Sequence, residues 1–102
     1  MAEWVPVARQ EALLEGCMYR VHVGDRPIVL AQIQGQVRAF DARCPHASAD
    51  LAEGDLRPGY VICPLHAYRY DLRTGRCLKP PDGPRLRVYE VRVQGEIVWV
   101  KG

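Results

Sequence analysis

Short apolar segments separated by turn residues recur along this chain. The segments predicted as strands are rich in apolar, β-branched and aromatic residues, and they span residues 18–23, 26–34, 37–41, 60–63, 68–72, 86–93 and 96–101. The one segment with a helical pattern covers residues 9–15 and ends at Gly16. Many short strands bounded by turns are typical of an all-β protein.

Two glycine-containing turns and one irregularity interrupt this pattern. Residues 34–36 (Gln-Gly-Gln) and 94–95 (Gln-Gly) join consecutive strands, and such dipeptides favour tight β-hairpins. Within 86–93 the apolar positions switch from even to odd numbers at Tyr89. This switch predicts a β-bulge near Tyr89.

The middle of the chain is organised differently from its ends. Residues 41–84 are rich in proline and contain only short strand candidates. The irregular stretch 41–58 is long for an unsupported loop, and a metal centre at its base would support it. We therefore predict one domain over 1–102, with basal β-sheets from 1–40 and 85–102 and a loop-rich, metal-binding subdomain over 41–84.

Length and charge exclude several classes of function. The chain has 102 residues, a net charge of +2 and interspersed acidic and basic side chains. This charge is too small and too evenly spread for a nucleic-acid surface. No apolar segment is long enough to span a bilayer, and the first four residues lack a signal-peptide pattern. We expect a cytoplasmic protein with no membrane or nucleic-acid partner.

Two short motifs carry the metal-binding chemistry. Cys44-Pro45-His46 is followed, after sixteen residues, by Cys63-Pro64-Leu65-His66. In a reducing compartment, cysteines paired with histidines favour a metal site over a disulfide. The predicted metal ligands are therefore Cys44, His46, Cys63 and His66. Cys17 and Cys77 have no neighbouring histidine and are predicted to be structural, although a disulfide between them stays open.

Two metal centres remain as alternatives for this ligand set. Two cysteines and two histidines can hold a structural zinc ion, and the chain would then be a zinc-stapled interaction module. Zinc fingers, however, group their cysteines together and place their histidines on a helix. Here each loop carries one residue of each kind, which favours a two-iron, two-sulfide cluster with thiolates on one iron and imidazoles on the other.

Charge explains what the mixed ligand set would do to such a cluster. Two ferric ions, two sulfides and two thiolates have no net charge, whereas four thiolates leave two negative charges. Adding an electron to a neutral centre is easier, so replacing thiolates with imidazoles raises the reduction potential. Because imidazoles titrate, the potential should also depend on pH.

The two motifs resemble the cluster-binding loops of Rieske proteins, most of all the small Rieske-type ferredoxins. The resemblance rests on Cys44-Pro45-His46, on the run from Cys63 to Gly75, on Leu51-Ala52-Glu53-Gly54 and on Lys79-Pro80-Pro81. It implies one [2Fe-2S] cluster per chain, with Cys44 and Cys63 on the inner iron and His46 and His66 on the outer iron. It also implies stacked antiparallel sheets with the cluster exposed at one tip.

The chain departs from high-potential Rieske proteins at the residues around the loops. Ala49 and Leu65 stand where those proteins have two further cysteines that form a disulfide. Tyr70 matches a tyrosine that can donate to a cluster thiolate, whereas Tyr68 replaces a small hydroxyl residue. With fewer hydrogen bonds to sulfur, we expect a potential toward the low end of roughly −150 to +300 mV.

Ser48 and Ala67 are a second departure, because they stand where the family often has glycine. Their small side chains are compatible with the loops.

Three functions are consistent with these features. The first, by resemblance, is a monomeric one-electron carrier that passes electrons from a flavin-dependent reductase to a terminal oxygenase in a dioxygenase system. The second is the small Rieske subunit of an assimilatory nitrite reductase, and the third is the zinc module. None of these makes the chain an enzyme by itself, because after ligand assignment only His22 remains for a mononuclear iron site.

Overall fold

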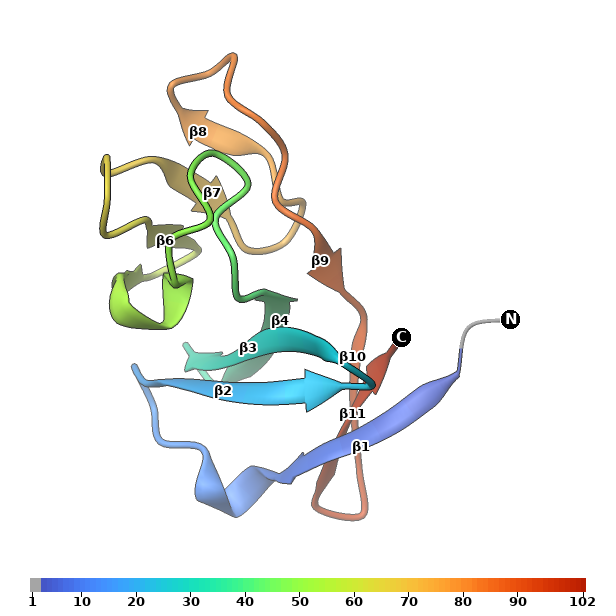
Figure 1. Ribbon diagram of the computed structural model, residues 1–102. Helices are drawn as coiled ribbons and strands as arrows, with labels where there is room; N and C mark the ends of the chain where they lie inside the picture. The colour runs from blue at the N-terminus through green and yellow to red at the C-terminus, as the bar shows by residue number, and fades with distance from the viewer. Residues whose placement is uncertain (1–2) are drawn as a thin grey trace.

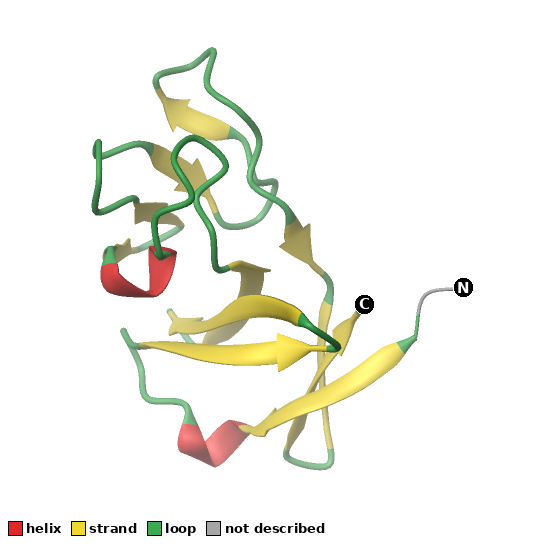
Figure 2. Ribbon diagram, in the orientation of Figure 1, coloured by secondary structure: helices red, strands yellow, loops and turns green. Residues whose placement is uncertain are grey.

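The computed structural model describes residues 3–102 and contains strands β1 to β11 and two single-turn 3₁₀ helices, η1 and η2. The strands form three antiparallel sheets (Figure 1, Figure 2). Two sheets make up the lower half of the molecule in Figure 1, and the third lies with long loops in the upper half. The all-β prediction is confirmed.

The first sheet joins the two ends of the chain. Its strand order is β1 (Trp4–Arg9), β11 (Ile97–Lys101) and β10 (Val91–Gln94). β1 is not among the predicted strands, because Pro6 interrupts its pattern. β1 is an edge strand whose register shifts between Pro6 and Ala8, and proline is tolerated at such edges and bulges.

The second sheet carries the most buried strand. Its order is β2 (Met18–Val23), β3 (Arg26–Ile33), β4 (Gln36–Asp41) and β9 (Val88–Tyr89). Along β3, Val29 and Ala31 pack into the core beneath the loops, whereas Ile28 and Leu30 pack into the core between the basal sheets. Because both faces of β3 are buried, its sequence is a continuous apolar run and not an alternating one.

The third sheet is small and lies between the loops. Its order is β5 (Asp55–Arg57), β6 (Tyr60–Ile62), β7 (Arg69–Asp71) and β8 (Cys77–Lys79). The predicted strands 60–63 and 68–72 correspond to β6 and β7, each shortened at its ends. β5 and β8 were missed, as was η2 (Leu51–Glu53) within the stretch 41–58.

The predicted strand 86–93 is divided between two sheets. β9 pairs with β4, and β10 pairs with β11. The prediction of a bulge near Tyr89 is therefore wrong: the chain leaves one sheet at Glu90 and joins the next. The parity changes because Leu86 and Val88 face the core beneath the loops, whereas Tyr89 and Val91 face the core between the basal sheets.

The predicted helix over 9–15 is also wrong in extent. Only η1 (Gln10–Ala12) forms, because β1 continues through Arg9 and Leu13 is already extended. The glycine that ends the segment is placed correctly: Gly16 has a φ of 81°, and its N–H donates to the Gln32 carbonyl at 2.6 Å.

The four cysteines are all free thiols, so the Cys17–Cys77 disulfide that the sequence left open does not form. Cys17 is half-buried before β2, and Cys77 is buried at the start of β8. No helix within residues 3–102 has the length and apolar character needed to cross a membrane.

Candidate metal centre

Two loops bring the predicted ligands to the same end of the molecule. The first loop, residues 44–49, follows β4, and the second loop, residues 63–68, joins β6 to β7. In the first, the Ser48 N–H donates to the Cys44 carbonyl at 2.7 Å, and the Cys44 N–H donates to the Ala49 carbonyl at 2.8 Å. These two hydrogen bonds close the first loop into a tight turn.

The second loop repeats the pattern at matching positions. The Ala67 N–H donates to the Cys63 carbonyl at 3.1 Å, and the Cys63 N–H donates to the Tyr68 carbonyl at 2.7 Å. Each cysteine therefore begins an equivalent tight turn. The similarity is hidden in the sequence, because the histidine is two residues after the cysteine in one loop and three residues after it in the other.

Ser48 and Ala67 occupy the same backbone conformation in the two loops. Their φ angles are 56° and 58°, in the left-handed region that glycine adopts most easily. This conformation explains why a glycine would suit both positions, and it shows that the loops keep the glycine-type turn with small side chains in its place.

The loops direct the thiols inward and the imidazoles outward. Cys44 and Cys63 are each only 1% exposed, whereas His46 and His66 are exposed. The two imidazole rings meet edge to face, with centroids 5.0 Å apart and an interplanar angle of 69°. The four residues predicted from the sequence are thus brought together as a buried pair and an exposed pair.

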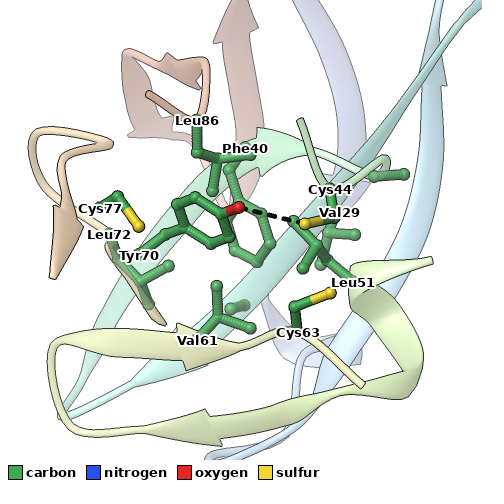
Figure 3. Close-up of a cluster of buried hydrophobic side chains, with 12 residues drawn as sticks. Val29, Phe40, Cys44, Leu51, Val61, Cys63, Tyr70, Leu72, Cys77 and Leu86 are labelled. Atoms are coloured by element: carbon green, nitrogen blue, oxygen red, sulfur yellow. Dashed lines mark hydrogen bonds between the residues drawn. The ribbon is translucent and has the colours of Figure 1, made fainter. Parts of the chain in front are cut away.

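On the buried side of the site, Tyr70, which follows the second loop, contacts Cys44 of the first loop. Its hydroxyl oxygen lies 3.1 Å from the Cys44 sulfur, and the residue is fully buried on β7 (Figure 3). Burial, followed by the nearby Cys44 thiol, raises the pKa of Tyr70 well above its ordinary value. The hydroxyl therefore keeps its proton and is available to donate to this sulfur.

The cysteine pair lies in an apolar environment. Burial raises the pKa of the Cys63 thiol, and the neighbouring Cys44 thiol raises it further, whereas the backbone N–H of Leu65 lowers it. Burial likewise raises the pKa of Cys77. Because metals bind the thiolate, metal binding at Cys63 must release a proton, which a buried site resists unless the metal supplies the compensating charge.

The arrangement of the donors favours one of the two predicted metal centres. The thiols form the buried pair and the imidazoles the exposed pair. A two-metal group with sulfur ligands at one end and nitrogen ligands at the other fits this division.

The contacts that Tyr68 and Asp50 make around the loops were not identified from the sequence. Tyr68 stacks on His46, with ring centroids 3.9 Å apart and an interplanar angle of 17°. Asp50 accepts from the Ala52 N–H at 3.0 Å and forms an ion pair with Arg20 of β2. The stack and the ion pair join segments that are distant in the chain, so no local sequence signal indicated them. The Asp50 cap is local, and it was missed together with η2.

Comparisons with known proteins agree with this geometry. The family model for the Rieske [2Fe-2S] domain matches residues 3–90. The ferredoxin component of a naphthalene 1,2-dioxygenase system from Pseudomonas aeruginosa is 30% identical over 98 residues, which cover 96% of this chain and 94% of that protein.

Solved structures show the same fold over nearly the whole chain. The ferredoxin of carbazole 1,9a-dioxygenase from Nocardioides aromaticivorans IC177 superposes with a TM-score of 0.89 at 30% identity, covering 95% of each chain. A chain in a complex of reduced oxygenase and oxidized ferredoxin of carbazole 1,9a-dioxygenase gives a TM-score of 0.88 at 31% identity, covering 97% of this chain and 93% of that one. On its sequence, its fold and the arrangement of its two loops, the chain belongs to the Rieske [2Fe-2S] ferredoxins.

Proposed function

We propose that this chain is a one-electron carrier in which Cys44 and Cys63 hold the inner iron of the Rieske cluster and His46 and His66 hold the outer iron. The observation that carries this assignment is the inward direction of both thiols and the exposure of both imidazoles. When bound, the cluster supplies a reversible one-electron centre.

The protein's own residues provide its environment. The core beneath the loops, which includes Val29, Phe40, Leu51 and Val61, excludes water from the thiol side. Tyr70 offers a neutral hydroxyl to the Cys44 sulfur. A donor to sulfur stabilises added negative charge there, so Tyr70 favours the reduced state.

The exposed tip is suited to brief contact with partner proteins. Both loops are uncharged between Cys44 and Ala49 and between Cys63 and Tyr68, and Leu65 beside His66 is 50% exposed. A small, mainly apolar contact surface is appropriate for a carrier that must dissociate quickly. The imidazoles at this surface would shorten the path for electrons to a docked partner.

We further propose that the acceptor is a terminal oxygenase and the donor is a flavin-dependent reductase. The relatives include ferredoxin components of dioxygenase systems, and one solved structure is a complex of a ferredoxin with its oxygenase. The low-end potential and the cytoplasmic location stay predictions from the sequence.

Metal analysis of anaerobically purified protein tests the cluster assignment. We expect two iron and two sulfide per chain, and a reduced-state paramagnetic resonance spectrum with a low average g value, as mixed sulfur and nitrogen ligation requires. Zinc without acid-labile sulfide would overturn the proposal. Copurification with a large flavin or sirohaem subunit would instead support the nitrite reductase alternative.

A matched pair of leucine substitutions tests the docking surface. Leu65→Ser should raise the apparent KM for the terminal oxygenase several-fold without moving the reduction potential. Leu14→Ser is the control, because Leu14 is 63% exposed, follows η1 in the chain and lies outside both loops. Equal effects of the two variants would show that the tip is not the docking surface.

A further inference from the structure

No disulfide joins the two loops, since all four cysteines are free thiols. Three side-chain contacts cross between the loop segments instead. They are the hydroxyl–sulfur contact of Tyr70 with Cys44, the edge-to-face contact of His46 with His66, and the stack of Tyr68 on His46. Tyr68 is the half-buried member of this set: it is not a proposed ligand, and it packs against the edge of the core beneath the loops.

The backbone of the second loop holds Tyr68 in place. The Tyr68 carbonyl accepts the 2.7 Å hydrogen bond that closes this loop, and Arg69, the next residue, begins β7. The ring is also positioned by Tyr70, whose ring centroid lies 6.5 Å away at a tilt of 40°. Tyr68 is therefore a fixed platform on one loop that reaches a side chain of the other.

Tyr68 stacks on one of the two histidines, His46, and the two imidazoles therefore have different surroundings. The Tyr68 ring lies nearly parallel to the His46 imidazole at 3.9 Å, whereas the aromatic contact of His66 is the edge-to-face one with His46. A parallel ring on one face restricts rotation of an imidazole about its bond to Cβ. It also removes that face from water, and such aromatic pairs contribute beyond the area they bury.

We propose that Tyr68 is a positioning residue that fixes the ring plane of His46 and fastens the first loop to the second. The inference rests on the proposed function, because it takes His46 as a ligand. Tyr68 acts through His46: it limits the orientations of the imidazole and opposes separation of the loops, and we expect this restraint to slow the loss of bound iron.

Substitutions that keep or remove the ring test this role. Holoprotein carrying Tyr68→Ala should lose its visible absorption to an iron chelator about 2- to 12-fold faster than wild type, the range expected for one aromatic pair. Its reduced-state paramagnetic resonance lines should broaden, because the His46 ring plane becomes variable. Tyr68→Phe keeps the stack, so it should restore both the wild-type rate and the wild-type line widths.

Tyr60→Ala is the matched control. Tyr60 is a half-buried tyrosine on β6 that contacts the Arg69 guanidinium and lies outside both loops. It should leave the line widths unchanged. If Tyr60→Ala broadens the lines and speeds iron loss as much as Tyr68→Ala, general weakening of the small sheet is the cause and the proposal is wrong.

The outcomes for the cluster and for Tyr68 are separable. A wild-type protein without iron and sulfide would overturn both the proposed function and this inference. A loaded wild-type protein together with a Tyr68→Ala variant of unchanged lines and iron-loss rate would overturn the role of Tyr68 alone.

Discussion

The first metal-binding loop (44–49) is fastened to the basal sheets, whereas the second loop (63–68) belongs to the small sheet β5–β8. Just before the first loop, the Ala42 N–H donates to the Pro27 carbonyl at 3.1 Å, and just after it, Asp50 pairs with Arg20 of β2. The second loop connects β6 to β7, which pair with each other directly. The loops nevertheless share one backbone turn and one inward cysteine.

This difference shows how the site is assembled. Each loop forms its own turn from local hydrogen bonds, but the distance between the two cysteines depends on how the small sheet packs on the basal sheets. The core beneath the loops contains Val29 and Phe40 from the second sheet together with Val61 and Tyr70 from the small sheet. The proposed ligand pairs therefore lie at the joint between two separately supported structures.

The largest expected effect is a fall in the reduction potential when either loop histidine is replaced by cysteine, because both are proposed ligands of the same iron. His46→Cys and His66→Cys should each lower the reduction potential by roughly 100–300 mV, because a thiolate adds a negative charge that a neutral imidazole lacks. A redox titration followed by paramagnetic resonance measures the shift. His22→Cys is the control, since His22 is exposed on β2, and it should leave the potential unchanged. A wild-type potential in either loop variant would refute this shared role.

The next largest effect is expected at Asp50, whose contacts fasten the end of the first loop. Asp50→Ala removes both the cap on the Ala52 N–H and the ion pair with Arg20, and it should lower the free energy of unfolding by about 1–2 kcal/mol. Urea unfolding of the holoprotein measures this change. Arg20→Gln removes the ion pair alone and should cost less than about 1 kcal/mol. Equal losses would mean that the ion pair, and not the cap, supports the loop.

The hydroxyl contact to one sulfur should distinguish the two cysteines. Tyr70→Phe removes the donor beside Cys44 and should lower the potential by about 40 mV, which corresponds to about 1 kcal/mol for a one-electron couple. Tyr89→Phe is the control, because its hydroxyl donates to Asp41 away from both loops. A potential that moves equally in both variants would indicate an unspecific effect of losing a buried hydroxyl.

The smallest expected effect tests the shared left-handed turn. Ser48→Gly and Ala67→Gly should each raise the free energy of unfolding by about 0.5–1 kcal/mol, because glycine removes the cost of a positive φ but adds entropy to the unfolded chain. Thermal unfolding of the holoprotein should show a rise of a few degrees for each. Ala47→Gly, whose residue lacks a positive φ, should instead lower stability.

Most strands could be predicted because their patterns are local. The hairpin turns at Gln34-Gly35 and at Gly95-Glu96 have positive φ angles at both central positions, as tight hairpins require, although the second was predicted one residue too early. β5 and β8 were missed because neither three-residue strand contains a β-branched or aromatic residue, whereas β6 and β7, which are equally short, do. The division of 86–93 was missed because a change of sheet and a bulge produce the same change of parity.

Around the candidate metal centre, too, some features follow from the sequence and others appear only in the folded protein. Residue order alone predicts Cys44, His46, Cys63 and His66 as a set of ligands, because ligand chemistry depends on residue type and short spacing. Which of them face inward, the contact of Tyr70 with Cys44 and the stack of Tyr68 on His46 could not be read from that order. These features depend on how two loops that are distant in the chain pack together, and only the folded protein brings those loops into contact.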